Sequence, residues 1–247
     1  MEHKLYVILG ANSEVGMAYI KHMEEKKEMC EVIAHYHQSS KEWETLLETC
    51  SNVHICPVQA DFSEEAQIEK VIGIIQEKGV PTHILHCAAP CFSYKKIKEL
   101  NWQEIMTSMN IQVGAIVKIC QAFLPAMGKN HYGKIVLMLS SVTLGMPPKY
   151  MTDYTMVKYT LLGFMKSIAC EYTTKGICIN GISPSMIKTK FLRQVDERIV
   201  ELLEEQHPQK RMVMIDEVVS KIAFLMSKDS DFMTGENLNV SGGQVIT

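Results

Sequence analysis

Short apolar runs alternate with amphipathic stretches along the whole chain. The apolar runs predict strands at Leu5–Leu9, Glu31–Tyr36, Val53–Val58, His83–Cys87, Lys134–Leu139, Ile177–Ile182 and Leu238–Val240. The stretches between them predict helices at about Glu14–Lys27, Lys41–Thr49, Glu64–Lys78, Trp102–Met127, Asp153–Thr173, Lys190–Glu205 and Asp216–Met226. Ser63 is the expected N-cap of the third helix.

Strands that alternate with helices of this length indicate βαβ units with right-handed crossovers. The expected fold is therefore a doubly wound α/β domain with about seven parallel strands and helices on both faces. A length of 247 residues suits one such domain, and neither a linker nor a repeat divides residues 1–247.

The balance of charge and apolar residues narrows the class of protein. The chain is 47% hydrophobic with a net charge of −3, which disfavours a nucleic-acid-binding protein with a basic face. The apolar run Leu5–Leu9 is too short for a signal peptide or a membrane span. Eight scattered cysteines without a C-x-x-C pair favour reduced thiols. We therefore predict a soluble cytoplasmic protein that does not interact with membranes.

A glycine-containing turn follows the first predicted strand. Gly10 and Gly16 enclose it, with Asn12, Ser13 and Val15 between them. Glycine allows the backbone to approach a dinucleotide pyrophosphate, and the helix that follows offers free N–H groups and partial positive charge. An ordinary tight turn would also explain the two glycines.

The second predicted strand ends in His35-Tyr36-His37-Gln38-Ser39-Ser40, without an acidic residue. A carboxylate there would bind ribose hydroxyls and repel a 2′-phosphate, so its absence favours a phosphorylated ribose. His35 and His37 lie on the same side of the strand, but further ligands are missing nearby, and we predict no metal site.

Tyr154 and Lys158 lie four residues apart near the start of a predicted helix, which places them on one helical face. A free tyrosine has a pKa near 10, and a neighbouring lysine charge favours the phenolate. Such a pair also occurs by chance on helix surfaces. Ser141 follows the fifth predicted strand, thirteen residues ahead of Tyr154, and Asn110 falls within the long helical region.

These motifs together resemble the short-chain dehydrogenase/reductase family, which has a Rossmann-type fold. Gly10 and Gly16 match two of its glycines, whereas Leu9 and Glu14 replace its threonine and middle glycine. The resemblance extends from Leu5 to about Gly243. It implies cofactor-binding residues Gly10, Asn12, Ser13, Val15, Gly16, Tyr36, His37, Asp61, Phe62, Ala88, Ala89, Tyr154, Lys158, Pro184, Ile187 and Thr189.

The resemblance also implies a catalytic set of Asn110, Ser141, Tyr154 and Lys158. Tyr154 would exchange a proton with the substrate oxygen, and Ser141 would hydrogen bond to that oxygen. Lys158 would bind the nicotinamide ribose and lower the tyrosine pKa, and Asn110 would link Lys158 to a proton relay. The expected cofactor is NADP(H), with NAD(H) as the alternative.

The segment Thr234–Gly243 most resembles β-ketoacyl-carrier-protein reductases. The implied substrate is a ketone, including a β-ketoacyl thioester on an acyl carrier protein, or the matching secondary alcohol. Lysines that could contact an acidic carrier are Lys95, Lys96, Lys98, Lys129 and Lys175. The departures at Leu9, Glu14 and His86-Cys87 leave a second hypothesis open, a catalytically silent nucleotide-sensing or interaction protein.

The remaining expectations concern the substrate and the assembly. Substrate walls are expected at 90–94, 144–150 and a substrate-binding segment of about 186–212. These supply Phe92, Tyr94, Met146, Tyr150, Met186, Phe191 and Leu192. The two long helices, around 103–127 and 153–173, would pack against their mates in a homotetramer or homodimer.

Overall fold

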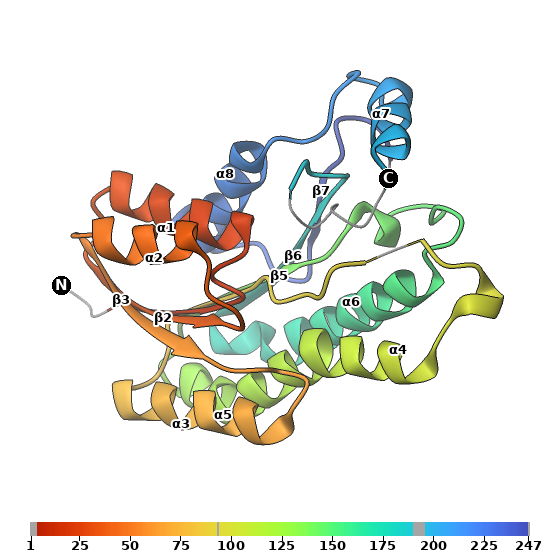
Figure 1. The fold of residues 1–247 in the computed structure, drawn as a ribbon. Helices are drawn as coiled ribbons and strands as arrows, with labels where there is room; N and C mark the ends of the chain where they lie inside the picture. The colour runs from red at the N-terminus through yellow and green to blue at the C-terminus, as the bar shows by residue number, and fades with distance from the viewer. Residues whose placement is uncertain (1–3, 93, 190–195, 247) are drawn as a thin grey trace.

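A single parallel sheet forms the centre of the molecule (Figure 1). The computed structural model describes residues 4–92, 94–189 and 196–246. The sheet has the strand order β3-β2-β1-β4-β5-β6-β7. Its strands are β1 (Leu5–Leu9), β2 (Cys30–Tyr36), β3 (Val53–Gln59), β4 (His83–His86), β5 (Gly133–Met138), β6 (Ile177–Pro184) and β7 (Asn237–Val240). The predicted fold class is confirmed.

Helices cover both faces of the sheet (Figure 1). One face carries α1 (Glu14–Glu25), α2 (Lys41–Thr49) and α8 (Ile215–Met226). The other face carries α3 (Glu65–Lys78), α5 (Ala115–Lys129) and α6 (Thr152–Tyr172). Two further helices, α4 (Trp102–Met109) and α7 (Glu197–Gln206), lie toward the end of the molecule where the strands finish.

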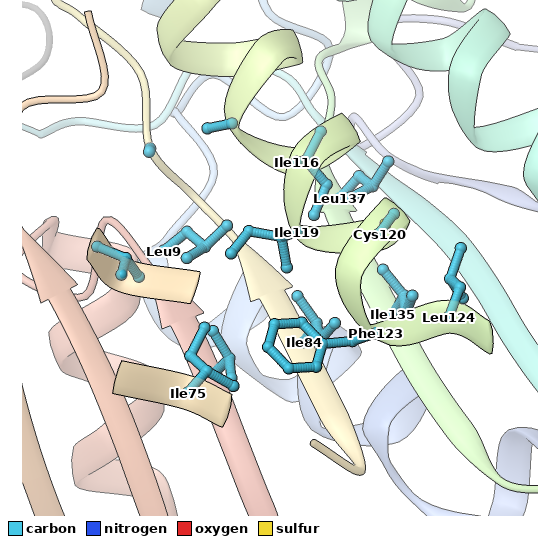
Figure 2. Packing of buried hydrophobic residues seen from close by; sticks show 14 of the residues in the cluster. Leu9, Ile75, Ile84, Ile116, Ile119, Cys120, Phe123, Leu124, Ile135 and Leu137 are labelled. Atoms are coloured by element: carbon cyan, nitrogen blue, oxygen red, sulfur yellow. The ribbon is translucent and has the colours of Figure 1, made fainter. Parts of the chain in front are cut away.

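Apolar residues of the strands face both helical layers, as expected for a parallel sheet covered on each side. Figure 2 shows the layer beneath α5, in which Ile116, Ile119 and Phe123 lie over Ile84 and Ile135 of the sheet. The continuous run Trp102–Lys129 is apolar and long enough to span a membrane by composition. Its buried face, however, belongs to this core.

The long helix expected over 102–127 is interrupted. Its hydrogen-bonding pattern changes to a π-helical turn at Asn110–Gly114, where Ala115 N donates to Asn110 O. Such turns are frequent at functional sites. The expected cap at Ser63 is wrong, because the helix begins one residue later than expected and Glu64 is its N-cap.

The helix predicted from residue 190 begins at Glu197 within the described residues. Asp196 caps it by accepting from Arg198 N at 2.9 Å. The predicted part over 190–195 lies outside the described residues. All eight cysteines are free thiols, four of them buried.

The strand order reverses between β1 and β4, because the chain builds outward in one direction to β3 and in the other to β7. In open α/β sheets, ligands bind beyond the carboxyl ends of the strands at such a reversal. The glycine turn after β1 and the segment after β4 both lie there, so the topology places the predicted functional residues at one edge.

Candidate active site

A cavity of about 540 Å³ opens at the carboxyl ends of the strands. Its walls come from the turn after β1, the segments after β2, β4, β5 and β6, and the start of α6. Segments far apart in the sequence therefore meet in one space. This size suits an extended small-molecule ligand.

Tyr154 and Lys158 both line this cavity from the first two turns of α6. The Lys158 Nζ atom lies 5.6 Å from the centre of the Tyr154 ring and donates a hydrogen bond to Met138 O at 2.7 Å. Lys158 is only 3% exposed, so its charge is held in a buried setting with one carbonyl partner at the end of β5. The structure brings together the pair that the sequence predicted.

Burial shifts the pKa values of both Lys158 and Tyr154. It lowers the pKa of Lys158 to about 8, because the ammonium is cut off from water. It raises the pKa of Tyr154 to about 12, and a hydrogen bond with the Ser140 side chain opposes this rise. In the protein alone, desolvation of the phenolate raises the tyrosine pKa, and the Lys158 ammonium donates to Met138 O. The expected lowering of the tyrosine pKa by Lys158 stays a prediction for the cofactor-bound enzyme.

Tyr154 forms a hydrogen bond with the side chain of Ser140. Ser140 caps the short 3-10 helix Ser141–Thr143, with its side chain accepting from Val142 N at 3.4 Å. Ser141 lines the same cavity one residue further on. Its predicted catalytic role therefore stays a prediction, and Ser140 joins it as a candidate that the residue spacing overlooked.

Asn110 is exposed at the start of the π-helical turn, and its carbonyl oxygen accepts from Ala115 N. Asn110 is not one of the described residues that line the cavity. The proposed link to Lys158 therefore stays a prediction.

The glycine turn is closely packed where the sequence predicted a phosphate site. Gly10 has φ +78°, and a Cβ there would lie 2.6 Å from Ala88 N. A Cβ on Gly16 would lie 2.7 Å from Ala11 O. Only glycine fits these contacts without displacing backbone, which keeps the turn tight and its N–H groups close to the cavity. The turn therefore fits the pyrophosphate of a nicotinamide dinucleotide.

Three predicted residues of this turn line the cavity, namely Asn12, Ser13 and Val15. Ser13 caps α1 by accepting from Gly16 N at 3.1 Å, and Asn12 Nδ2 donates to Gln38 O at 2.7 Å. These bonds fix the turn against both α1 and the segment after β2. Glu14, the unusual acid in this motif, also lines the cavity.

The residues predicted to bind the adenosine end of the cofactor differ in their exposure and in their contacts. His37 is exposed, and its Nε2 lies 3.6 Å from Asp61 Oδ2. The pKa of Asp61 is lowered chiefly by the backbone N–H of Ser63. Tyr36 packs beside Trp43, with ring centres 5.6 Å apart. These three side chains are not among the described residues that line the cavity.

Phe62 is buried at 2% exposure and stacks on His35 in the core, so any cofactor contact at this position would come from its backbone. The residues after β2 that do line the cavity are Gln38, Ser39 and Ser40. Ser40 caps α2, and a serine directly before a predicted helix is the signal that could have found this position in the sequence.

At the other end, Ala89, Pro184, Ile187 and Thr189 line the cavity as predicted. Ala88 is buried behind Ala89, against the backbone of Gly10. The small side chains at 88 and 89 let β4 end directly beside the glycine turn. The predicted nicotinamide end and the Tyr154 side chain thus share one space.

The expected substrate walls are partly present. Phe92, Tyr94 and Met186 line the cavity, whereas Met146 and Tyr150 are exposed at 97% and 51% and do not. Phe191 and Leu192 lie outside the described residues. Pro148, Leu203, His207, Arg211 and Met212 also line the cavity, and they lie within the expected wall segments. Two lining residues, Met151 and Gln244, lie outside the segments that were expected to form the walls.

The part of the chain that the structure describes contains no group of three or more His, Cys, Asp or Glu side chains that could hold a metal ion. The fold and site together define a dinucleotide-binding α/β enzyme with a tyrosine–lysine pair.

Comparisons with known proteins agree with this class. A family model described as enoyl-(acyl carrier protein) reductase matches residues 10–244. The chain belongs to this family and, with it, to the short-chain dehydrogenase/reductases. It is therefore an oxidoreductase that acts on CH–OH or C=O groups with a nicotinamide cofactor.

Two curated relatives are reductases of ketoacyl thioesters by name. Acetoacetyl-CoA reductase of Allochromatium vinosum is 27% identical over 224 residues, which cover 88% of this chain and 89% of that protein. A 3-oxoacyl-[acyl-carrier-protein] reductase of Buchnera aphidicola is 27% identical over 186 residues, covering 75% and 76% respectively.

Solved structures share the fold. Levodione reductase superimposes with a TM-score of 0.88 at 23% identity, covering 98% of this chain and 97% of that one. The 3-oxoacyl-[acyl-carrier protein] reductase of Brucella melitensis gives 0.84 at 21% identity, covering 99% and 92%. The comparisons give no support to the alternative of a catalytically silent nucleotide sensor.

Proposed function

We propose that this protein is an NADPH-dependent ketoreductase of β-ketoacyl thioesters. One observation carries the proposal: the Tyr154–Lys158 pair and residues Asn12–Val15 of the close-packed glycine turn lie on the walls of a single cavity. A ligand long enough to touch the turn with its phosphates therefore brings its other end to the tyrosine.

In the proposed reaction, the cofactor and a few side chains each have a separate role. The bound cofactor supplies the hydride. Tyr154 Oη donates a proton to the carbonyl oxygen, and a serine hydroxyl from Ser140 or Ser141 donates a hydrogen bond to the same oxygen as negative charge develops. Lys158 stays cationic below about pH 8 and stabilises the phenolate that remains after proton transfer. Asn110 is proposed only as a backbone support of this region.

The preference for NADPH over NADH rests on the segment after β2. An acid that would repel a 2′-phosphate is missing at the end of this strand, and the hydroxyl-bearing Ser39 and Ser40 line the cavity at the N-terminus of α2. Hydroxyl groups and free N–H groups at a helix N-terminus suit an anionic oxygen. His37 already has Asp61 as a neighbour, which makes it the weaker candidate.

The substrate class is supported by the two curated relatives and by the apolar lining of Phe92, Tyr94 and Met186. A carrier protein or coenzyme A would approach from the rim formed by Lys95, Lys96 and Lys98. Lys129 is the last residue of α5 and Lys175 follows α6, so both stand near the amino ends of the strands, opposite the cavity. Within one chain they cannot serve this rim. A cytoplasmic location fits the eight free cysteines.

The test is the oxidation of NADPH followed at 340 nm with acetoacetyl-CoA, an acetoacetyl carrier protein and a panel of simple ketones. We expect turnover of the thioesters and a lower KM for NADPH than for NADH. Turnover of simple ketones alone would overturn the substrate assignment, and a strong NADH preference would overturn the cofactor assignment. The Tyr154→Phe variant provides the blank for adventitious reductase activity.

A further inference from the structure

One buried imidazole contacts both the glycine turn and the segment after β3, two of the segments predicted to bind the cofactor. His35, on β2, is 3% exposed. Its Nδ1 accepts a hydrogen bond from Gly10 N at 3.1 Å, and its Nε2 lies 3.0 Å from Ala60 O. Its ring stacks on Phe62 with centres 3.6 Å apart and planes within 7°. The glycine turn and the segment after β3 therefore meet on the two edges and the face of one side chain.

The contacts determine the tautomer of His35. A backbone N–H can only donate, so Nδ1 must present a lone pair to Gly10. The single ring proton then resides on Nε2, where it is donated to Ala60 O. Burial agrees with a neutral ring, because it lowers the pKa of His35 to about 4. The main chain of His35 adds a further link, since its carbonyl oxygen accepts from Ala11 N at 2.7 Å.

We infer that His35 is a positioning residue that sets the glycine turn and the segment after β3 for the adenosine half of the cofactor. This inference rests on the nicotinamide-cofactor site of the proposed function. Gly10 has a left-handed backbone and touches Ala88, so the turn has a defined conformation that must be held before the ligand arrives. His35 holds it through the Gly10 N–H, which would otherwise be a buried donor without a partner.

The chain offers a matched control in His83. This residue is also a buried histidine, 1% exposed, and it stacks on Tyr6 with ring centres 4.1 Å apart. It stands at the first residue of β4, the amino end of the sheet, away from the cavity. Replacing His35 or His83 by Phe removes comparable buried polar contacts and retains an aromatic ring. The two variants differ in the end of the sheet that they disturb.

The experiment measures binding of NADPH, 2′,5′-ADP and reduced nicotinamide mononucleotide to wild type, His35→Phe, His35→Asn and His83→Phe. Thermal unfolding and amide hydrogen exchange of each free protein are measured in parallel. His35→Phe should weaken NADPH and 2′,5′-ADP about 10-fold and leave the mononucleotide within about 2-fold. Exchange of the segment containing Gly10 should accelerate. His35→Asn, whose Oδ1 can replace Nδ1 as acceptor, should recover most of the loss.

Two results would overturn the inference. The first is that His35→Phe and His83→Phe weaken NADPH equally, which would make His35 an ordinary core residue. The second is unchanged exchange at the glycine turn in His35→Phe. If wild type bound neither NADPH nor NADH, the proposed function would fail instead. Hydrogen exchange in the free proteins would then still decide whether His35 holds the turn.

Discussion

The two ends of the cavity differ in how closely their residues match the family pattern. At the catalytic end, Tyr154 and Lys158 keep the residue types and spacing of the family, and α6 holds them in place. At the phosphate end, Leu9, Glu14 and His86 depart from the family pattern, yet the glycine turn is packed tightly enough that a Cβ at Gly10 would overlap Ala88.

The difference follows from what each end must supply. Proton transfer requires particular side-chain groups with particular pKa values, so substitution removes the chemistry. Phosphate binding uses backbone N–H groups and a helix N-terminus, so side chains can vary while the backbone conformation persists. Variants at the catalytic end should therefore change turnover, whereas variants at the phosphate end should change cofactor affinity.

The largest effect is expected for Tyr154→Phe. Removing the phenolic proton donor should lower kcat for ketone reduction about 10²–10⁴-fold, because general acid catalysis contributes this much. Binding of NADPH should change little, since the aromatic ring remains. Steady-state kinetics together with fluorescence titration of NADPH test this separation, and a residual rate within a few-fold of wild type would assign the proton to another group.

Lys158→Met should reduce activity about 100-fold and at the same time stabilise the free protein at pH 7. The folded pKa of Lys158, about 8, lies below the ordinary 10.5. The unfolded chain therefore binds the proton more tightly between these values, and wild-type stability rises as pH increases from 8 to 10.5. Below pH 8 the full cost of burying the charge is present, on the order of 3 kcal/mol.

Thermal unfolding of wild type and Lys158→Met at pH 7 and pH 10 measures this effect. The stability advantage of the methionine variant should shrink at the higher pH. The same titration should appear in catalysis, with kcat/KM for reduction falling above about pH 8 as Lys158 loses its charge. An advantage that stays constant with pH would show that packing, and not charge burial, separates the two proteins.

Glu14→Gln probes the phosphate end. Glu14 lines the cavity in the first turn of α1, where a carboxylate favours the helix but repels a pyrophosphate. Removing the charge should tighten NADPH binding about 3–10-fold at low salt, with kcat unchanged. The gain should diminish in 0.5 M salt, because screening weakens the original repulsion. Tighter binding that persists at high salt would point to a steric cause, for which Glu14→Gly is the comparison.

The sequence predicted the architecture well because its signals are local and repeated. All seven strands and the alternation with helices follow from apolar runs, and the Tyr154–Lys158 pair follows from helical periodicity. The π-helical turn at Asn110 could not be read from the same periodicity, since one wider turn shifts the apolar pattern by only one residue within a long helix that is apolar over much of its length.

Contacts between distant segments were the harder part of the site. The bond between Ser140 and Tyr154 depends on how the backbone leaves β5, and spacing alone favoured Ser141. The exposure of Met146 reflects the path of a loop. Likewise, the role of His35 depends on Gly10 and Ala60, which only the folded sheet brings together. Local patterns predict elements, whereas tertiary contacts decide which neighbouring side chain faces the cavity.

The smallest effect concerns a surface behind the catalytic end. Trp102 and Met106 on α4 are 65% and 36% exposed, and Met156 and Tyr159 on the neighbouring α6 are 42% and 43% exposed. We expect this apolar face to pack in a homo-oligomer. Met106→Glu should shift the mass in light scattering toward the monomer and lower kcat about 2–5-fold, because α6 carries Tyr154 and loses its outer support. The Kd for 2′,5′-ADP should not change, since the phosphate end lies on other elements. A monomeric wild type would contradict the expected assembly. An equal loss of kcat and of 2′,5′-ADP affinity in Met106→Glu would remove the distinction between the catalytic end and the phosphate end of the cavity.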